Sequence, residues 1–96
     1  MKPDLTRIPH IWCDFNACGL SGKENDISYY SLHRERLKEL NPYNGMKVFV
    51  YDNDLDDDGN PSIVGCFARL EKIEGFTSPW KATPENGEWY YGPALW

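Results

Sequence analysis

The chain lacks the long apolar segments that membranes and secretion require. None of its 96 residues lie in an apolar run near the roughly 18–20 residues of a membrane-spanning helix. The first nine residues are polar and broken by proline, unlike the apolar region of a signal peptide. Cysteine is scarce, and Cys13, Cys18 and Cys66 are an odd number, which disfavours a disulfide framework. We therefore expect a cytoplasmic protein with reduced thiols and no membrane association.

The sequence also lacks the motifs of catalysis and of nucleic-acid binding. Neither of its two histidines lies in a nucleophile motif, and no glycine-rich phosphate loop occurs. Asp14, the one carboxylate within an aromatic strand segment, is expected to accept hydrogen bonds from backbone amides. The one basic cluster, residues 34–38, is interrupted by Glu35 and is typical of a solvated helix face. The sequence therefore predicts neither an enzyme nor a nucleic-acid-binding protein.

No cofactor is expected, and four candidate soft metal ligands do not have zinc-site spacing: His10, Cys13, Cys18 and Cys66. His10 and Cys13 are three positions apart on a predicted strand, so their side chains face opposite sides. The spacing from Cys13 to Cys18 is wider than that of a structural zinc knuckle. Cys66 lies in an apolar strand, where cysteine behaves as a small hydrophobic residue.

One acidic segment stands out against this background. Residues 52–58 contain five aspartates, and the whole chain has 15 acidic and 10 basic residues, for a net charge of −5. Without those five aspartates, acidic and basic residues would be equal in number. The excess negative charge is therefore local, which argues against a DNA mimic with evenly spread carboxylates. Asp58-Gly59 and the following Asn60-Pro61 predict a turn between two strands.

The acidic segment matches only the first half of an EF-hand loop. Asp54, Asp56 and Asp58 occupy the first, third and fifth positions, and Gly59 the sixth. The twelfth position is Gly65, which has no carboxylate, and the flanking segments are strands. We therefore favour a charged turn in which aspartates cap backbone amides and protect strand edges from pairing. Weak Ca²⁺ binding by the Asp54–Asp58 loop is the alternative.

Hydropathy patterns predict short strands and one helix. Strands are expected at residues 10–16, 46–51 and 63–73. The one helical pattern lies within residues 27–41, and Asn41-Pro42 ends it because proline disfavours helical geometry in the preceding residue. In the second strand, the side chains of even-numbered residues from 46 face one side. Those of residues 49 and 51 face the other, which is either buried or carries an aromatic patch.

Glycine supplies two further signals. Gly65 within its strand predicts a bulge or bend. Asn86-Gly87 predicts a hairpin that joins residues 80–83 to residues 88–91. We expect one domain over residues 1–96, of mainly β class: a small antiparallel barrel, SH3-like or OB-like, with one short helix.

Three segments together resemble small uncharacterised bacterial proteins. These segments are Ile-Trp-Cys-Asp-Phe-Asn at 11–16, Gly-Met-Lys-Val-Phe-Val-Tyr at 45–51 and Asp-Leu-Asp-Asp-Asp-Gly-Asn-Pro at 54–61. The resemblance is to proteins with a W-x-x-F-N-like first strand and an acidic D-x-D-D-G-N-P-like turn, and it covers about a third of the chain. It implies a bacterial or phage origin and a compact β-rich fold, and it carries no activity.

Aromatic residues are abundant for a chain of this length, with four Trp, six Tyr and four Phe. They either fill a core too small for aliphatic residues or form a binding face, since Trp and Tyr anchor many protein interfaces. We hypothesise a non-enzymatic interaction module that binds a protein partner through an aromatic face beside the acidic loop, a surface that suits a basic or a proline-containing peptide. The alternatives are the weak Ca²⁺-binding protein and a small phage- or plasmid-encoded inhibitor of a basic host protein. The proposed binding residues are Tyr51, Asp52, Asp54, Asp56, Asp58, Trp80, Trp89 and Tyr91.

Overall fold

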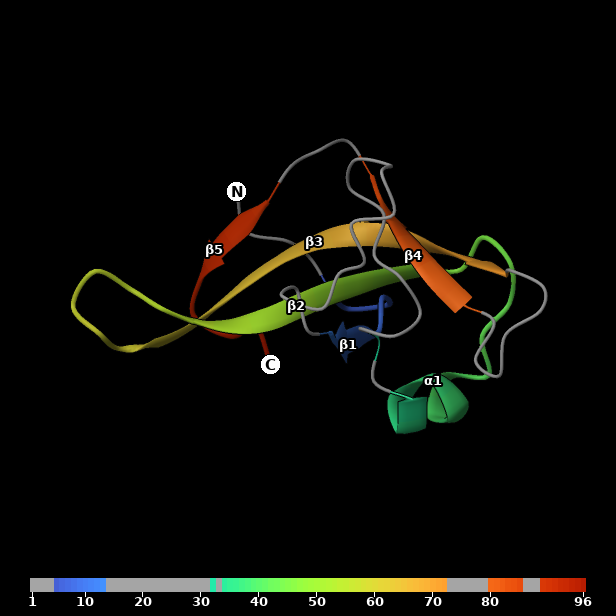
Figure 1. Ribbon diagram of the computed structural model, residues 1–96, viewed down its shortest axis with the longest axis horizontal. Coiled ribbons are helices and arrows are strands. Elements are labelled where there is room, and N and C mark those ends of the chain that lie inside the picture. Colours follow the sequence, from blue (N-terminus) through green and yellow to red (C-terminus); the bar gives the residue numbers. More distant parts are fainter. Residues whose placement is uncertain (1–4, 14–31, 33, 73–79, 86–88) are drawn as a thin grey trace.

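A mixed β-sheet and a short helix make up the described part of the protein (Figure 1). This computed structural model describes residues 5–13, 32, 34–72, 80–85 and 89–96. The strands are β1 (His10–Trp12), β2 (Lys47–Leu55), β3 (Pro61–Lys72), β4 (Trp80–Pro84) and β5 (Tyr90–Gly92), and the helix is α1 (Arg34–Leu40). The predicted mainly β class is confirmed.

The sheet is open and contains one parallel pair. The strand order is β1-β2-β3-β4, and β5 also pairs with β3. The β1–β2 pair is parallel, and the other pairs are antiparallel. No pairing within the described ranges joins β1 to β4, so the expected antiparallel barrel, SH3-like or OB-like, is not confirmed. A parallel first strand also differs from the antiparallel arrangement that the sequence suggested.

Strands β4 and β5 pair with separate segments of β3 and lie toward its two ends (Figure 1). β4 pairs with residues 68–72 of β3, and β5 pairs with residues 63–65. The hairpin predicted between these two segments is therefore wrong, because both pair with β3 instead of with each other. The twelve residues of β3 offer an edge long enough for two short strands in series. The predicted turn, residues 86–88, lies outside the described residues.

One face of the sheet, the core face, packs against α1. Alternate side chains of β2 and β3 point to this face, where Val48 pairs with Ala68 and Val50 with Cys66. The helix contributes Leu37. The core consists of Ile11, Cys13, Leu32, Leu37, Val48, Val50, Cys66, Ala68, Leu70 and Ala82, flanked by Leu40, Met46 and Trp80. No disulfide links Cys13 and Cys66, the two described cysteines.

The opposite face, here the aromatic face, explains Gly65. Phe49 is fully buried on this side and lies edge-on to Phe67, with ring centroids 5.4 Å apart. The β2–β3 register runs without interruption from Lys47 to Leu55, so the predicted bulge at Gly65 is wrong. A Cβ at Gly65 would lie 2.7 Å from the Phe49 ring and 2.6 Å from the backbone oxygen of Val50. The glycine provides space for the ring.

The helix occupies the end of its predicted range. α1 begins at Arg34, and Leu32 before it forms an isolated bridge to Cys13. After Leu40 the chain turns at Asn41, whose φ of 49° is left-handed, and Pro42 follows, as the sequence predicted. The earlier residues 27–31, together with the predicted strand residues 14–16 and Cys18, lie outside the described part. No helix within the described ranges is long and apolar enough to span a membrane.

Candidate functional site

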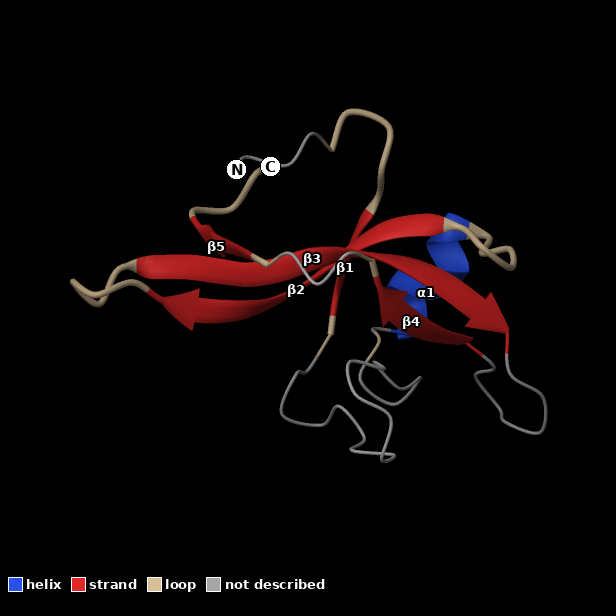
Figure 2. Ribbon diagram, turned by 90° about the horizontal axis from the view of Figure 1, so that it is seen from above, coloured by secondary structure: helices blue, strands red, loops and turns tan. Residues whose placement is uncertain are grey.

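The β2–β3 hairpin extends beyond the core at its turn end (Figures 1 and 2). The last core pair is Val50 with Cys66, and the ladder continues to Leu55 opposite Pro61. Among the described residues, no third strand flanks the final two pairs, because β1 pairs only as far as Tyr51 and β5 only as far as residue 63. Residues 53–61 are all exposed. We call residues 52–64 the arm.

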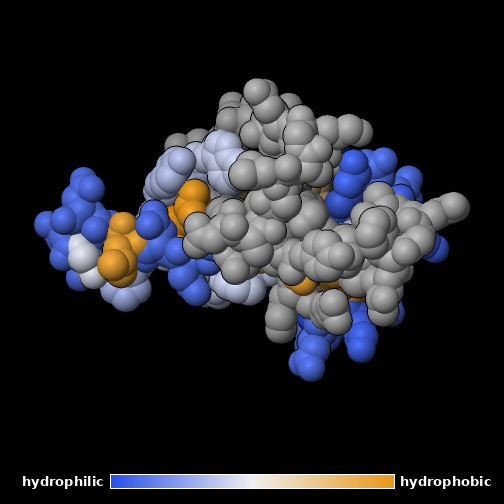
Figure 3. All heavy atoms as spheres, viewed as in Figure 1, coloured by the Kyte–Doolittle hydropathy of each residue, from blue (hydrophilic) through white to orange (hydrophobic). Residues whose placement is uncertain are grey.

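The arm has two chemically different faces, because side chains alternate along each strand. Asp52 and Asp54 continue the core face, where they pair with Val64 and Ser62. Leu55 continues the aromatic face, where it pairs with Pro61 and is 64% exposed. Figure 3 shows apolar surface on the projecting hairpin within a largely hydrophilic surround. The arm is therefore acidic on one side and apolar on the other.

At the tip of the arm, Asp56 holds the turn together. Its Oδ1 accepts hydrogen bonds from the backbone N–H groups of Asp58 at 2.9 Å and Asn60 at 2.8 Å. Its own N–H donates to the Asn60 oxygen, and its oxygen accepts from Gly59, whose φ of 81° is left-handed. The prediction that aspartates cap amides in this turn is confirmed. Asp57 and Asp58 are exposed beside it.

The acidic side chains of the arm do not converge on one point. Among the described residues, which include Asp54, Asp56 and Asp58, no group of three His, Cys, Asp or Glu side chains is arranged to hold a metal ion. One Asp56 oxygen, Oδ1, accepts two amide hydrogens from the turn itself. The geometry therefore does not favour the EF-hand-like alternative.

Side chains cap the backbone at the outer edge of the sheet. Phe49 N donates to Pro9 and Tyr51 O accepts from Cys13, so the backbone groups of odd-numbered β2 residues face β1. Beyond β1 the next such group is the N–H of Asn53, which donates to Asp52 Oδ1 at 2.7 Å. On β1 itself, Arg36 Nε donates to the His10 oxygen at 2.9 Å. Such caps obstruct pairing with another strand.

Three rings meet on the aromatic face at the base of the arm. The imidazole of His10 stacks on the indole of Trp96, with centroids 4.0 Å apart and planes 1° apart. Tyr51 lies 4.4 Å from Trp96 and 5.8 Å from His10. Burial is the main reason that the pKa of Tyr51 is raised, and burial followed by the charge of Arg36 lowers the pKa of His10. Trp96 remains 51% exposed.

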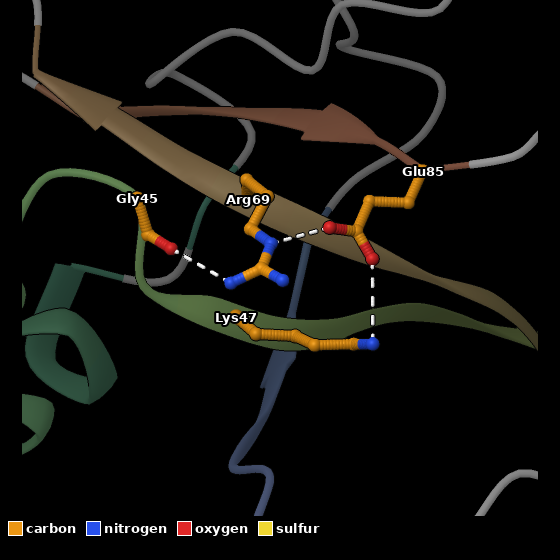
Figure 4. Close-up of polar contacts among 4 residues, drawn as sticks. All are labelled: Gly45, Lys47, Arg69 and Glu85. Carbon is orange, nitrogen blue, oxygen red and sulfur yellow. Dashed lines mark hydrogen bonds and ion pairs between the residues drawn. The ribbon is translucent and has the colours of Figure 1, made fainter.

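The far end of the aromatic face carries an ion cluster (Figure 4). The Glu85 carboxylate accepts a hydrogen bond from Arg69 Nε and pairs with Lys47 Nζ at 3.4 Å. Arg69 also donates to the Gly45 oxygen at 3.1 Å, and Lys47 Nζ lies 4.8 Å from the centroid of the Phe67 ring. The hydrogen bond from Arg69 is the main reason that the pKa of Glu85 is lowered. These charges are paired with one another, whereas no ion pair within the described part of the chain involves Asp57 or Asp58.

The predicted binding residues divide between two faces and two ends of the sheet. Asp52 pairs with Val64, and Val64 pairs on its other side with Tyr91, which is 69% exposed. Tyr51 lies on the opposite face, and Trp89, which is 36% exposed, directly precedes β5.

Trp80 lies farthest from the acidic loop. It pairs with Lys72, eleven residues along β3 from Pro61, a separation of about 35 Å at ~3.3 Å per residue. It also packs against the core. The structure therefore brings Asp52, Asp54 and Tyr91 together and separates Tyr51 and Trp80 from them.

Sequence reasoning missed two parts of this region. Trp96 and His10 contact each other although they are distant in the sequence, and no local pattern links them. Leu55 was overlooked because it lies within the aspartate run, although its alternation with Asp54 and Asp56 was a usable signal. Comparison with protein-family models, curated proteins and solved structures gives no match for this chain.

Proposed function

We propose that the protein is a non-enzymatic interaction module that binds a protein partner through its arm. The observation that carries this proposal is the exposure of Leu55 on a hairpin that extends beyond the core, with the exposed Tyr91 of β5 beside the opposite face of that hairpin. Full burial of an exposed leucine side chain in an interface contributes about 1.5–3 kcal/mol to the free energy of binding. Exposed tyrosines are among the residues that anchor interfaces most often.

The charge distribution supports a partner with a basic surface. Five aspartates lie within residues 52–58, and the remaining acidic and basic residues of the chain are equal in number. Among the described residues outside the arm, three acidic residues are paired with cations: Glu85 with Arg69 and Lys47, Glu71 with Lys81, and Glu39 with Arg36. A negative arm on an otherwise balanced surface steers a positive partner to the arm, and added salt weakens this attraction.

Capture from a cell lysate tests this proposal with a charge-matched control. The test variant is Asp57→Asn/Asp58→Asn, and the control, Glu35→Gln/Glu71→Gln, removes two exposed carboxylates away from the arm. We expect the wild-type chain and the control to retain the same proteins at low salt and the arm variant to lose them. Retention of the same proteins by all three chains would overturn the proposal.

The inhibitor and the Ca²⁺-binding alternatives can each be tested separately. An inhibitor of a basic host protein would use the same arm, and inhibition of the captured protein would identify it. A Ca²⁺-binding function through Asp54, Asp56 and Asp58 predicts heat and a higher melting temperature on titration with millimolar calcium. The absence of both would end that alternative.

A further inference from the structure

The side of the arm that continues the aromatic face, here called the strip, is apolar at both ends. Leu55 and Pro61 form its outer end, and both are exposed. Trp96 lies over Tyr51 at its inner end, four residues along β2 from Leu55, a distance of about 13 Å at ~3.3 Å per residue. Asn53, also exposed, lies between them. Ile63, which pairs with Asn53, is buried. Accessible apolar groups therefore mark the two ends of the strip, and the polar Asn53 separates them.

We propose that this strip is the surface that enters the partner, and that it docks in an apolar groove bordered by lysine or arginine side chains. This inference rests on the proposed function and specifies the face and the chemistry of the partner. The groove covers Leu55 and Pro61. Its basic border faces Asp54 on the reverse side of the arm and Asp57 and Asp58 at the tip.

The charge of the arm favours a partner with a basic border over a second copy of the chain. Two copies packed through the same strips would bring together two arms that each carry five aspartates. The two sets of aspartates would repel each other, and this repulsion would weaken self-association most at low salt. The same aspartates attract a groove with a basic border and so favour its binding to the arm.

The capped edge favours docking through side chains over addition of a strand. A strand added to the outer edge of the arm would need the N–H of Asn53, which already donates to Asp52. Breaking this hydrogen bond would reduce the free energy gained from the backbone hydrogen bonds to the added strand. The side chains of Leu55 and Pro61 remain available without any such exchange.

Two short peptides of equal length and charge test the inference. One alternates lysine with leucine, and the other alternates lysine with serine. We expect the lysine–leucine peptide to bind the full chain more tightly, measured by calorimetry at low salt. Leu55→Ser should weaken its binding about tenfold, the effect of losing one well-covered leucine. Tyr43→Ser, a matched change at a 63% exposed residue outside the arm, should leave binding unchanged.

The outcomes separate this inference from the proposed function. Equal binding of both peptides, lost in Asp57→Asn/Asp58→Asn and unaffected by Leu55→Ser, would overturn the apolar strip and retain an acidic binding arm. Binding that is unaffected by the arm variants, or no binding of either peptide, would overturn both. Self-association that increases on dilution of salt would overturn the choice of a basic partner over a second copy.

Discussion

Asp52 Oδ1 accepts the backbone N–H of its neighbour Asn53 at 2.7 Å, on the outer edge of β2 beyond the end of β1. The hydrogen bond leaves the Asp52 side chain on the acidic face of the arm and removes a donor from the edge. A single carboxylate thereby contributes both to the charge of the arm and to the protection of its backbone. This explains how a projecting hairpin can expose apolar side chains without offering a simple edge for strand addition.

Removal of this cap should promote self-association. Asp52→Val uncovers the Asn53 N–H and adds a β-branched side chain that favours pairing. Asp54→Val makes the same change of charge and size on the same face, two residues along, and serves as the control. We expect light scattering and sedimentation to detect larger species for Asp52→Val at concentrations where Asp54→Val remains unchanged. Equal association of the two variants would assign the effect to lost charge.

Asp56→Ala should destabilise the fold more than Asp57→Ala does. The first substitution leaves the N–H groups of Asp58 and Asn60 without their acceptor, at a cost of about 1–2 kcal/mol. The second removes an exposed charge from a repulsive cluster, so its effect should stay within about 0.5 kcal/mol. Urea denaturation followed by tryptophan fluorescence measures both. Similar losses in the two variants would contradict the role assigned to Asp56.

Gly65→Ala should destabilise the protein because its Cβ would overlap the Phe49 ring. Overpacking of this kind costs about 1–3 kcal/mol. Phe49→Leu removes the overlapping ring, so the double variant should lose less free energy of unfolding than the sum of the single losses. Additive losses in the double-mutant cycle would show that the ring does not impose the glycine.

Glu85 should stabilise the protein at neutral pH and lose this effect in acid. Its pKa is lowered in the folded state, chiefly by the hydrogen bond from Arg69, so the stabilisation is present above the unfolded-state pKa. The stabilisation disappears as the pH falls through the lowered, folded-state pKa. We expect Glu85→Gln to cost about 0.5–1 kcal/mol at pH 7, the range for a partly exposed pair.

The matching measurement is the free energy of unfolding of both chains as a function of pH. The curves for the wild-type chain and Glu85→Gln should converge as the pH falls below the folded-state pKa of Glu85. A gap that persists in acid would mean that the glutamine disturbs packing at Glu85.

Local alternation was the part of the fold that the sequence predicted well. The separation of Val48 and Val50 from Phe49 and Tyr51 follows from the two-residue period of a strand. The parallel pairing of β1 and the series arrangement of β4 and β5 did not follow, because edge choice depends on contacts between distant residues. The bulge predicted at Gly65 was also wrong, because the glycine is required by the Phe49 ring on the neighbouring strand, and no local pattern reveals that contact.

The sequence predicted the negative charge of the candidate site, but it did not predict how the site residues divide between the two faces of the sheet. Asp56 caps the turn as expected, since the hydrogen-bonding habit of aspartate is local. The division of Tyr51 and Asp52 between two faces follows from alternation once both are placed in one strand. The predicted strand ended at Tyr51, whereas β2 continues to Leu55, and this extension places Leu55 on the face opposite Asp52 and Asp54.

The most direct test of the arm as the binding surface is mapping of amide chemical shifts during titration with the lysine–leucine peptide. We predict that the largest changes fall within residues 52–64 and at Trp96, and that they diminish as salt is added. Changes confined to α1 and β4, with the arm unaffected, would contradict the account.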